Sequence, residues 1–143
     1  MQQDAIDRFV RYFEQLQPAD IARLDQHYAA DARFKDPFND VRGVPAIAQI
    51  FQHMFDSLEQ PRFVVTQQLQ QGSDVFLRWD FTFRFRNFQR DQLQRIEGAT
   101  HLKLDGAGLV TLHRDYWDAA EELYEKLPLV GGLMRWLKRR VQR

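Results

Sequence analysis

The chain has 143 residues, with 20 basic residues, 20 acidic residues and no cysteine. This length fits one domain with a sizeable core, and the balanced charge gives no overall footprint for nucleic acid. The lack of cysteine excludes disulfides, thiolate metal sites and cysteine nucleophiles. The first four residues lack the pattern of a signal peptide, and no apolar run is long enough to span a bilayer. We therefore expect a soluble, cytoplasmic protein.

The first part of the chain is expected to be mostly helical, because apolar side chains recur there at a spacing of three and four residues. Proline and glycine residues divide this part into separate elements. The expected elements are a helix over residues 4–16, a short helix between Pro18 and Tyr28, a brief strand over residues 33–36, and a helix from about Pro45 to Leu58 that Pro61 ends.

From residue 63 onward the apolar period changes to two, which is typical of strands. In residues 75–86 apolar side chains alternate with mostly charged ones, so this strand has one apolar and one charged face. The expected strands cover residues 63–69, 75–86, 93–104 and 109–118, with turns at 72–74 and 105–108. Segregated helices and strands indicate an α+β fold, with a curved, mainly antiparallel sheet wrapped over three N-terminal helices.

The segment Phe34-Lys-Asp-Pro-Phe38 places an acid directly ahead of a turn. Pro37 favours an extended conformation at Asp36, and the two flanking phenylalanines would remove the carboxylate partly from water. A carboxylate in such surroundings binds a proton more readily and would suit a general base near neutral pH. The alternative is simple turn chemistry, since Asp before Pro is common at strand ends.

Four segments make the chain resemble the nuclear transport factor 2-like superfamily, most closely its SnoaL-like and ketosteroid-isomerase-like branch. They are residues 28–37 (YAADARFKDP), 43–47 (GVPAI), 105–110 (DGAGLV) and 114–118 (RDYWD). The resemblance implies a cone-shaped α+β domain over residues 1–118, with residues 119–143 as a helical extension. The fold hosts isomerases, cyclases, dehydratases and binding modules. It therefore implies either cofactor-free proton transfer or ligand binding without catalysis.

The resemblance also implies roles for individual residues. Ketosteroid isomerases use the Asp of an Asp-Pro motif as base and a Tyr of the first helix as oxyanion donor, and Asp36 and Tyr12 match these positions. Their third catalytic group is an Asp on the penultimate strand, where this chain has Thr100, a weaker donor. SnoaL-type cyclases rely instead on an Asp late in the chain, which Asp115 matches.

The last predicted strand places His113, Asp115 and Trp117 on one face, which the resemblance directs inward. His113 would set the charge of Asp115 or take the proton itself. The candidate catalytic residues are therefore Asp36, Asp115, His113 and Tyr12, and the candidate ligand contacts are Thr100, Trp117, Trp79, Phe55 and Phe34. Three alternatives remain open: a structural His113–Asp115 pair, a bond from Asp115 to Arg33 or Arg42, and a packing role for Tyr12.

The implied ligand is a small, mostly apolar molecule such as a steroid, a polyketide or a lipid-like compound. No cofactor is expected, and the scattered His27, His53 and His101 give no metal-binding spacing. The charged face of the 75–86 strand is expected to be solvated or to form a homodimer through the sheet.

The C-terminal extension combines a basic and an apolar helical face. Its apolar residues are Val130, Leu133, Met134, Leu137 and Val141, opposite Arg135, Lys138, Arg139 and Arg140. Such a pattern suits a lid or packing helix, and it also suits a helix lying on an anionic membrane. We favour the lid or packing helix.

Overall fold

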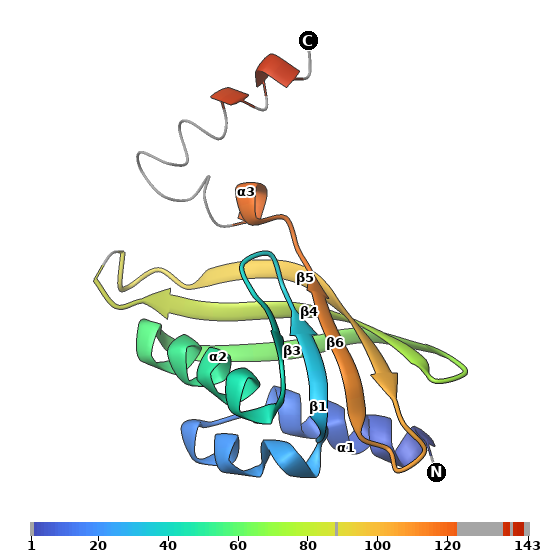
Figure 1. The fold of residues 1–143 in the computed structure, drawn as a ribbon. Coiled ribbons are helices and arrows are strands. Elements are labelled where there is room, and N and C mark those ends of the chain that lie inside the picture. Colours follow the sequence, from blue (N-terminus) through green and yellow to red (C-terminus); the bar gives the residue numbers. More distant parts are fainter. Residues whose placement is uncertain (1, 88, 123–135, 138, 142–143) are drawn as a thin grey trace.

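A computed structural model of the chain describes residues 2–87, 89–122, 136–137 and 139–141 (Figure 1). The elements in chain order are α1 (Gln2–Glu14), the 3₁₀ helix η1 (Pro18–Gln26), β1 (Tyr28–Lys35), β2 (Asp40–Arg42), α2 (Val44–Ser57), β3 (Leu58–Gln71), β4 (Asp74–Phe85), β5 (Gln94–Leu104), β6 (Val110–Tyr116) and α3 (Ala119–Glu122). The predicted α+β fold is confirmed. Much of the predicted tail helix, including Val130, Leu133, Met134, Arg135 and Lys138, lies outside the described residues.

The six strands form one curved sheet in the order β2-β1-β6-β5-β4-β3. β1 pairs with β6 in parallel, and all other neighbouring strands are antiparallel. α1, η1 and α2 cover one face of this sheet (Figure 1). β1 and β6 are therefore neighbours in the sheet, and neither is an edge strand, although about 75 residues separate them in the chain.

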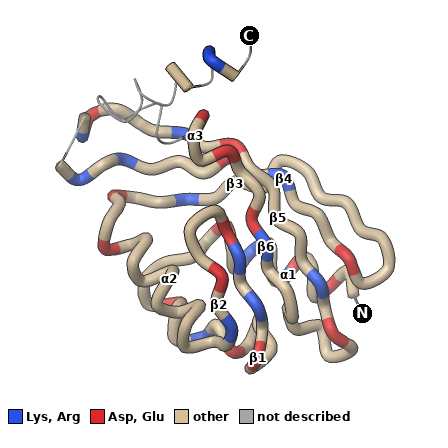
Figure 2. The backbone as a smooth tube through the Cα atoms, turned by 45° about the horizontal axis from the view of Figure 1, so that its top comes forward, with Lys and Arg blue, Asp and Glu red and all other residues tan. Residues whose placement is uncertain are grey.

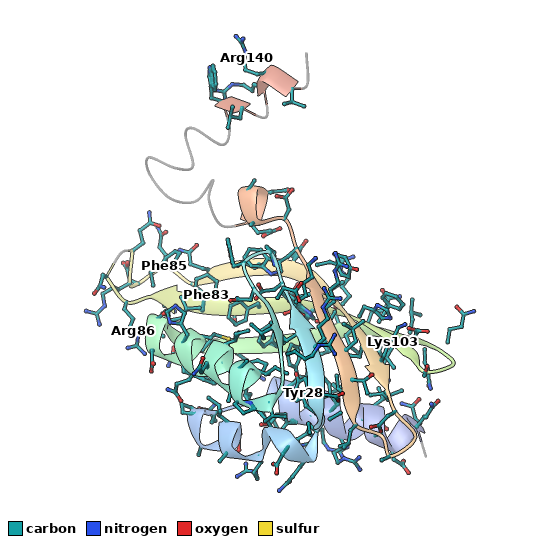
Figure 3. The ribbon with its side chains drawn as sticks, in the orientation of Figure 1. Tyr28, Phe83, Phe85, Arg86, Lys103 and Arg140 are labelled. Atoms are coloured by element: carbon teal, nitrogen blue, oxygen red, sulfur yellow. The ribbon has the colours of Figure 1, made fainter. Side chains whose placement is uncertain are left out.

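The core lies between the sheet and the helices. The predicted alternation on β4 is confirmed, because its inward side chains Val75, Leu77, Trp79, Phe81 and Phe83 are buried. They pack against the apolar stripes of α1 (Ile6, Phe9, Phe13) and α2 (Ile47, Phe51, Phe55). Tyr28 and Phe83 lie inside this layer (Figure 3).

Two local predictions were wrong. Pro61 does not end α2, which stops at Ser57; it lies within β3, a strand at the edge of the sheet. Proline is tolerated there because an edge strand has backbone donors without a partner strand, and the pairing with β4 is irregular between Glu59 and Arg62. Tyr28 does not close the second helix, since it is the first residue of β1, which begins five residues before the predicted strand.

Charged residues of both signs are interspersed along the chain (Figure 2). They occupy the outer face of the sheet and the exposed sides of the helices, where Arg33–Asp40 and Arg95–Asp80 form ion pairs. Within the described residues, no helix is long and apolar enough to cross a membrane.

Candidate functional site

A cavity of about 540 Å³ lies between α2, the turn after β1 and the inner face of the sheet. Five predicted site residues line it: Phe34, Asp36, Trp79, Asp115 and Trp117. The other lining residues are Phe38, Asn39, Val41, Ala46, Gln49, Ile50, Phe51, His53, Met54, Ser57, Leu58, Phe63, Phe81 and Ile96. The walls are thus mainly apolar and aromatic, with a few polar groups, as in most small-molecule sites.

Asp115 lies in the middle of a chain of buried hydrogen bonds. Its Oδ1 is 2.7 Å from His113 Nε2 and accepts a bond of 2.6 Å from the Thr100 hydroxyl. His113 and Thr100 are completely buried behind it. The predicted proximity of His113 and Asp115 is therefore confirmed.

The two ends of this chain are aromatic side chains. Tyr28 Oη lies 2.7 Å from His113 Nδ1, and Trp79 Nε1 donates a bond of 2.7 Å to Thr100 Oγ1. Phe34 packs beside the imidazole, with 4.5 Å between ring centroids. All five polar side chains are thereby held in place by packing and by each other.

The network has one arrangement of protons that satisfies every donor. Within the described residues, His113 Nδ1 is the only acceptor that the Tyr28 hydroxyl reaches, so the proton of a neutral His113 is on Nε2 and points at Asp115. Trp79 donates to Thr100, so the Thr100 hydroxyl donates to Asp115. Both bonds end on Oδ1 of Asp115. No described residue bonds to its other oxygen, Oδ2.

Burial keeps the far end of the network neutral. The pKa of Tyr28 lies well above its ordinary value of 10.0, because its hydroxyl is completely removed from water; the Asp115 charge adds to the shift. Tyr28 therefore acts as a donor to His113 and not as a proton source at neutral pH.

Asp36 lines the same cavity but has a structural task. Its Oδ1 accepts hydrogen bonds from the backbone N–H groups of Phe38 (2.8 Å) and Asn39 (2.7 Å), and the Asn39 amide bonds to both carboxylate oxygens. These donors stabilise the carboxylate and fix the turn between β1 and β2.

Tyr12 and Phe55 do not line this cavity. The Tyr12 hydroxyl donates to the backbone carbonyl of Asp20, and its ring stacks on His27 with 3.9 Å between centroids. Burial raises the pKa of Tyr12 to about 12. Phe55 is buried on α2 and borders a second hollow near Pro18. The structure therefore does not bring Tyr12 to the two acids, and the packing alternative describes its contacts.

Sequence reasoning did not assign Tyr28 to the site, because it treated this residue as part of a helix. Its position in β1, parallel to β6, places it beside His113. Strand pairing over such a chain distance has no local signal in the sequence. Neither alternative partner of Asp115 contacts it: Arg33 binds Asp40, and Arg42 reaches the Asp31 carbonyl. Within the described part of the chain, no group of three or more His, Asp or Glu side chains is arranged to hold a metal ion.

Comparisons with known proteins agree with this fold. Residues 9–115 match the family model of the SnoaL-like domain. No curated protein matches the sequence.

Several solved structures are similar in fold, at low sequence identity. One is a ketosteroid isomerase-like protein from Catenulispora acidiphila in complex with trimethylamine (TM-score 0.70, 16% identity, 83% of this chain and 88% of that chain). A second is a provisionally named SnoaL-like polyketide cyclase from Shewanella putrefaciens (0.68, 20%, 85% and 95%). A third is an LEH-like epoxide hydrolase from M. tuberculosis (0.67, 15%, 94% and 90%).

Proposed function

The chain belongs to the SnoaL-like domain family, and on this basis we propose that it binds a small, mostly apolar molecule in the cavity under α2 and acts on it by proton transfer. Asp115 is the base. The observation that carries this proposal is the pair of buried hydrogen bonds that meet at Oδ1 of Asp115, a residue of the cavity lining whose Oδ2 has no described hydrogen-bond partner. Bonds to one oxygen orient the carboxylate, while the other oxygen has no described partner and remains available for a substrate proton.

Asp115 suits this role better than Asp36. Both acids line the cavity, but Asp36 accepts two backbone bonds and two amide bonds that hold a turn. Asp115 is backed by an imidazole whose second nitrogen is fixed by Tyr28. The Nε2 proton of His113 bonds to Oδ1 both before and after Asp115 takes up a proton, so the pair holds the carboxyl group in place while Asp115 receives the substrate proton and returns it. No cofactor is needed for isomerisation, aldol-type cyclisation or dehydration by this route.

A second candidate is ligand binding without catalysis. It is favoured by the two donors that the resemblance would assign to an oxyanion, since the Tyr12 hydroxyl is bonded to Asp20 and the Thr100 hydroxyl to Asp115. An enolate formed in the cavity would therefore lack these two donors.

Two experiments separate these candidates. Native mass spectrometry of protein purified from its own host, followed by denaturation, identifies a retained small molecule and its class. With that compound at saturating concentration, Asp115→Asn is expected to lower turnover by about 10²–10⁴-fold, while its amide oxygen still accepts both buried bonds and keeps the fold. Asp36→Asn, which also keeps its turn acceptor, is the comparison variant, and at saturating substrate it should keep most of the turnover rate because Asp36 is not the base. Full activity in Asp115→Asn would leave only the binding candidate.

We also propose that the protein is a homodimer through the outer face of the sheet. The helices α1, η1 and α2 lie on the opposite face (Figure 1), and the outer face exposes Phe76, Leu69 and Tyr116 among charged residues. Single exposed apolar side chains are ordinary, whereas Leu69 and Phe76 are direct neighbours across β3 and β4.

A further inference from the structure

We infer that the ligand of the cavity carries a positively charged nitrogen, as a protonated or quaternary amine, on its otherwise apolar body. This inference rests on the proposed function only in one respect, namely that the cavity holds a ligand. It does not depend on whether Asp115 acts as a base.

The first argument is the charge of the cavity lining. Asp36 and Asp115 are both on it, and none of the described lysines and arginines is. The parallel pairing of β1 with β6 includes Lys35 and Arg114, and Asp36 and Asp115 are the residues that follow them, so the two acids come from neighbouring segments of the backbone. His53 is the only other titratable group in the lining. A negatively charged ligand would therefore meet two carboxylates and no cation.

The nearest basic side chains lie on the other side of the strands. Lys35 and Arg114 directly precede the two acids in the chain, and they line an outer hollow that Asp36, Asp115 and Asp118 also border. Lys35 is the strand partner of Asp40, and the Arg114 guanidinium lies 4.6 Å from the Tyr116 ring centroid. These cations face the outer hollow, and neither reaches the cavity lining.

The second argument is the aromatic content of the walls. Seven of the lining residues are Phe or Trp: Phe34, Phe38, Phe51, Phe63, Trp79, Phe81 and Trp117. The face of an aromatic ring attracts a cation, most strongly for tryptophan and in sites removed from water. Aromatic walls with carboxylates at one end are the combination that recognises an ammonium group in an apolar molecule.

The third argument is the state of the carboxylates. The Asp115 side chain is only 10% exposed, and its Oδ2 has no described hydrogen-bond partner. A nearly buried carboxylate oxygen without a donor is unfavourable, and an uncharged apolar ligand would remove its remaining water. A ligand cation would compensate this charge. Asp36, which lines the same cavity, offers the nitrogen a second carboxylate.

The test compares three probes of nearly identical shape. Choline carries the positive charge, neohexanol is its uncharged carbon analogue, and the anion of tert-butylacetic acid (called tert-butylacetate below) is a negatively charged counterpart. Binding is followed by NMR through the indole N–H resonances of Trp79 and Trp117. We expect choline to bind at least about tenfold more tightly than neohexanol, and tert-butylacetate to bind least.

Three variants assign the effect to the carboxylates. Asp36→Asn and Asp115→Asn should each weaken choline binding and leave neohexanol binding nearly unchanged. Asp31→Asn is the control, because Asp31 is on β1 as well but does not line the cavity. Equal binding of choline and neohexanol would overturn the inference and leave the apolar cavity and the base intact. Binding of none of the probes would count against both the inference and the cavity as a ligand site.

Discussion

The buried hydroxyl of Tyr28 decides which nitrogen of His113 carries the proton. It bonds to Nδ1, which leaves the Nε2 proton for Asp115. The imidazole is completely buried among aromatic rings, and this packing holds the ring in the orientation that directs Nδ1 to Tyr28 and Nε2 to Asp115. At the scale of single residues, the orientation of the candidate base thus depends on a side chain that never reaches the cavity.

Removing this hydroxyl should lower stability in a pH-dependent way. Tyr28→Phe leaves a buried nitrogen without its donor, which costs about 1–3 kcal/mol at neutral pH. Because the native pKa of Tyr28 is raised, its contribution is complete below about pH 10 and is lost as the pH rises above that value, where the unfolded chain gives up the proton first. Urea unfolding at about pH 8 and about pH 11 should therefore show the gap between wild type and variant shrinking by about 1.4 kcal/mol.

Tyr116→Phe serves as the control for this series. Tyr116 is 47% exposed on the outer face, so the substitution should change neither the stability nor its alkaline slope. A gap between wild type and Tyr28→Phe that stays constant up to about pH 11 would show that the hydroxyl is not held as described.

Both acids were expected at the site from the sequence, and the choice of base between Asp36 and Asp115 was left open. The Asp-Pro motif drew attention to Asp36, and the structure shows that the same local features, a turn and an adjacent Asn39, supply the donors that occupy it. Asp115 depends on residues from β1, β4 and β5. A single-sequence pattern reports local chemistry well, and it carries no information on partners brought together by strand pairing.

At the scale of the elements, Gly98 on β5 is the position that lets Trp79 reach Thr100. Trp79 and Gly98 are direct partners across β4 and β5. A Cβ atom at residue 98 would lie 2.4 Å from the indole Cη2, which is far inside van der Waals contact. The indole therefore lies across the bare backbone of β5, where it forms part of the cavity wall and donates to Thr100.

Gly98→Ala should displace this indole. We expect a loss of about 1–3 kcal/mol in the free energy of unfolding, typical of overpacking, and a shift of the Trp79 indole N–H resonance as its bond to Thr100 breaks. Thermal unfolding and NMR measure the two effects. Gly106→Ala is the matched control, since no atom lies within 4 Å of the added methyl group and its effect should stay within about 0.5 kcal/mol. An unchanged indole resonance in Gly98→Ala would contradict this account.

The strands with clear alternation were predicted closely, whereas elements that depend on their neighbours were not. β4 was expected over residues 75–86 and is found at Asp74–Phe85. β2 was not predicted, because its three residues become a strand only through pairing with β1. The start of β3 before Pro61 also depends on its place in the sheet, because an edge strand tolerates a proline that would interrupt a central strand.

At the scale of the whole molecule, the two faces of the sheet have different roles. The inner face carries the core, the cavity and the buried network, and the helices cover it (Figure 1). The outer face carries a row of directly paired residues that runs from Leu69 through Phe76, His101 and Arg114 to Lys35. Phe76 stacks on the His101 ring at 4.4 Å, so one end of this row is an ordered apolar and aromatic surface and the other is basic.

This surface is the proposed dimer interface, and a charge placed in it should separate the subunits. A twofold axis brings the same patch of both subunits together, so Phe76→Glu would bury two carboxylates in one interface. Light scattering after size exclusion should show a dimer for the wild type and a monomer for Phe76→Glu at micromolar concentration. Leu93→Glu is the control, because Leu93 is also exposed (61%, against 45% for Phe76) but precedes β5 in a loop. A monomeric wild type, or a dimer that survives Phe76→Glu, would mean that the outer face does not join two copies of this chain.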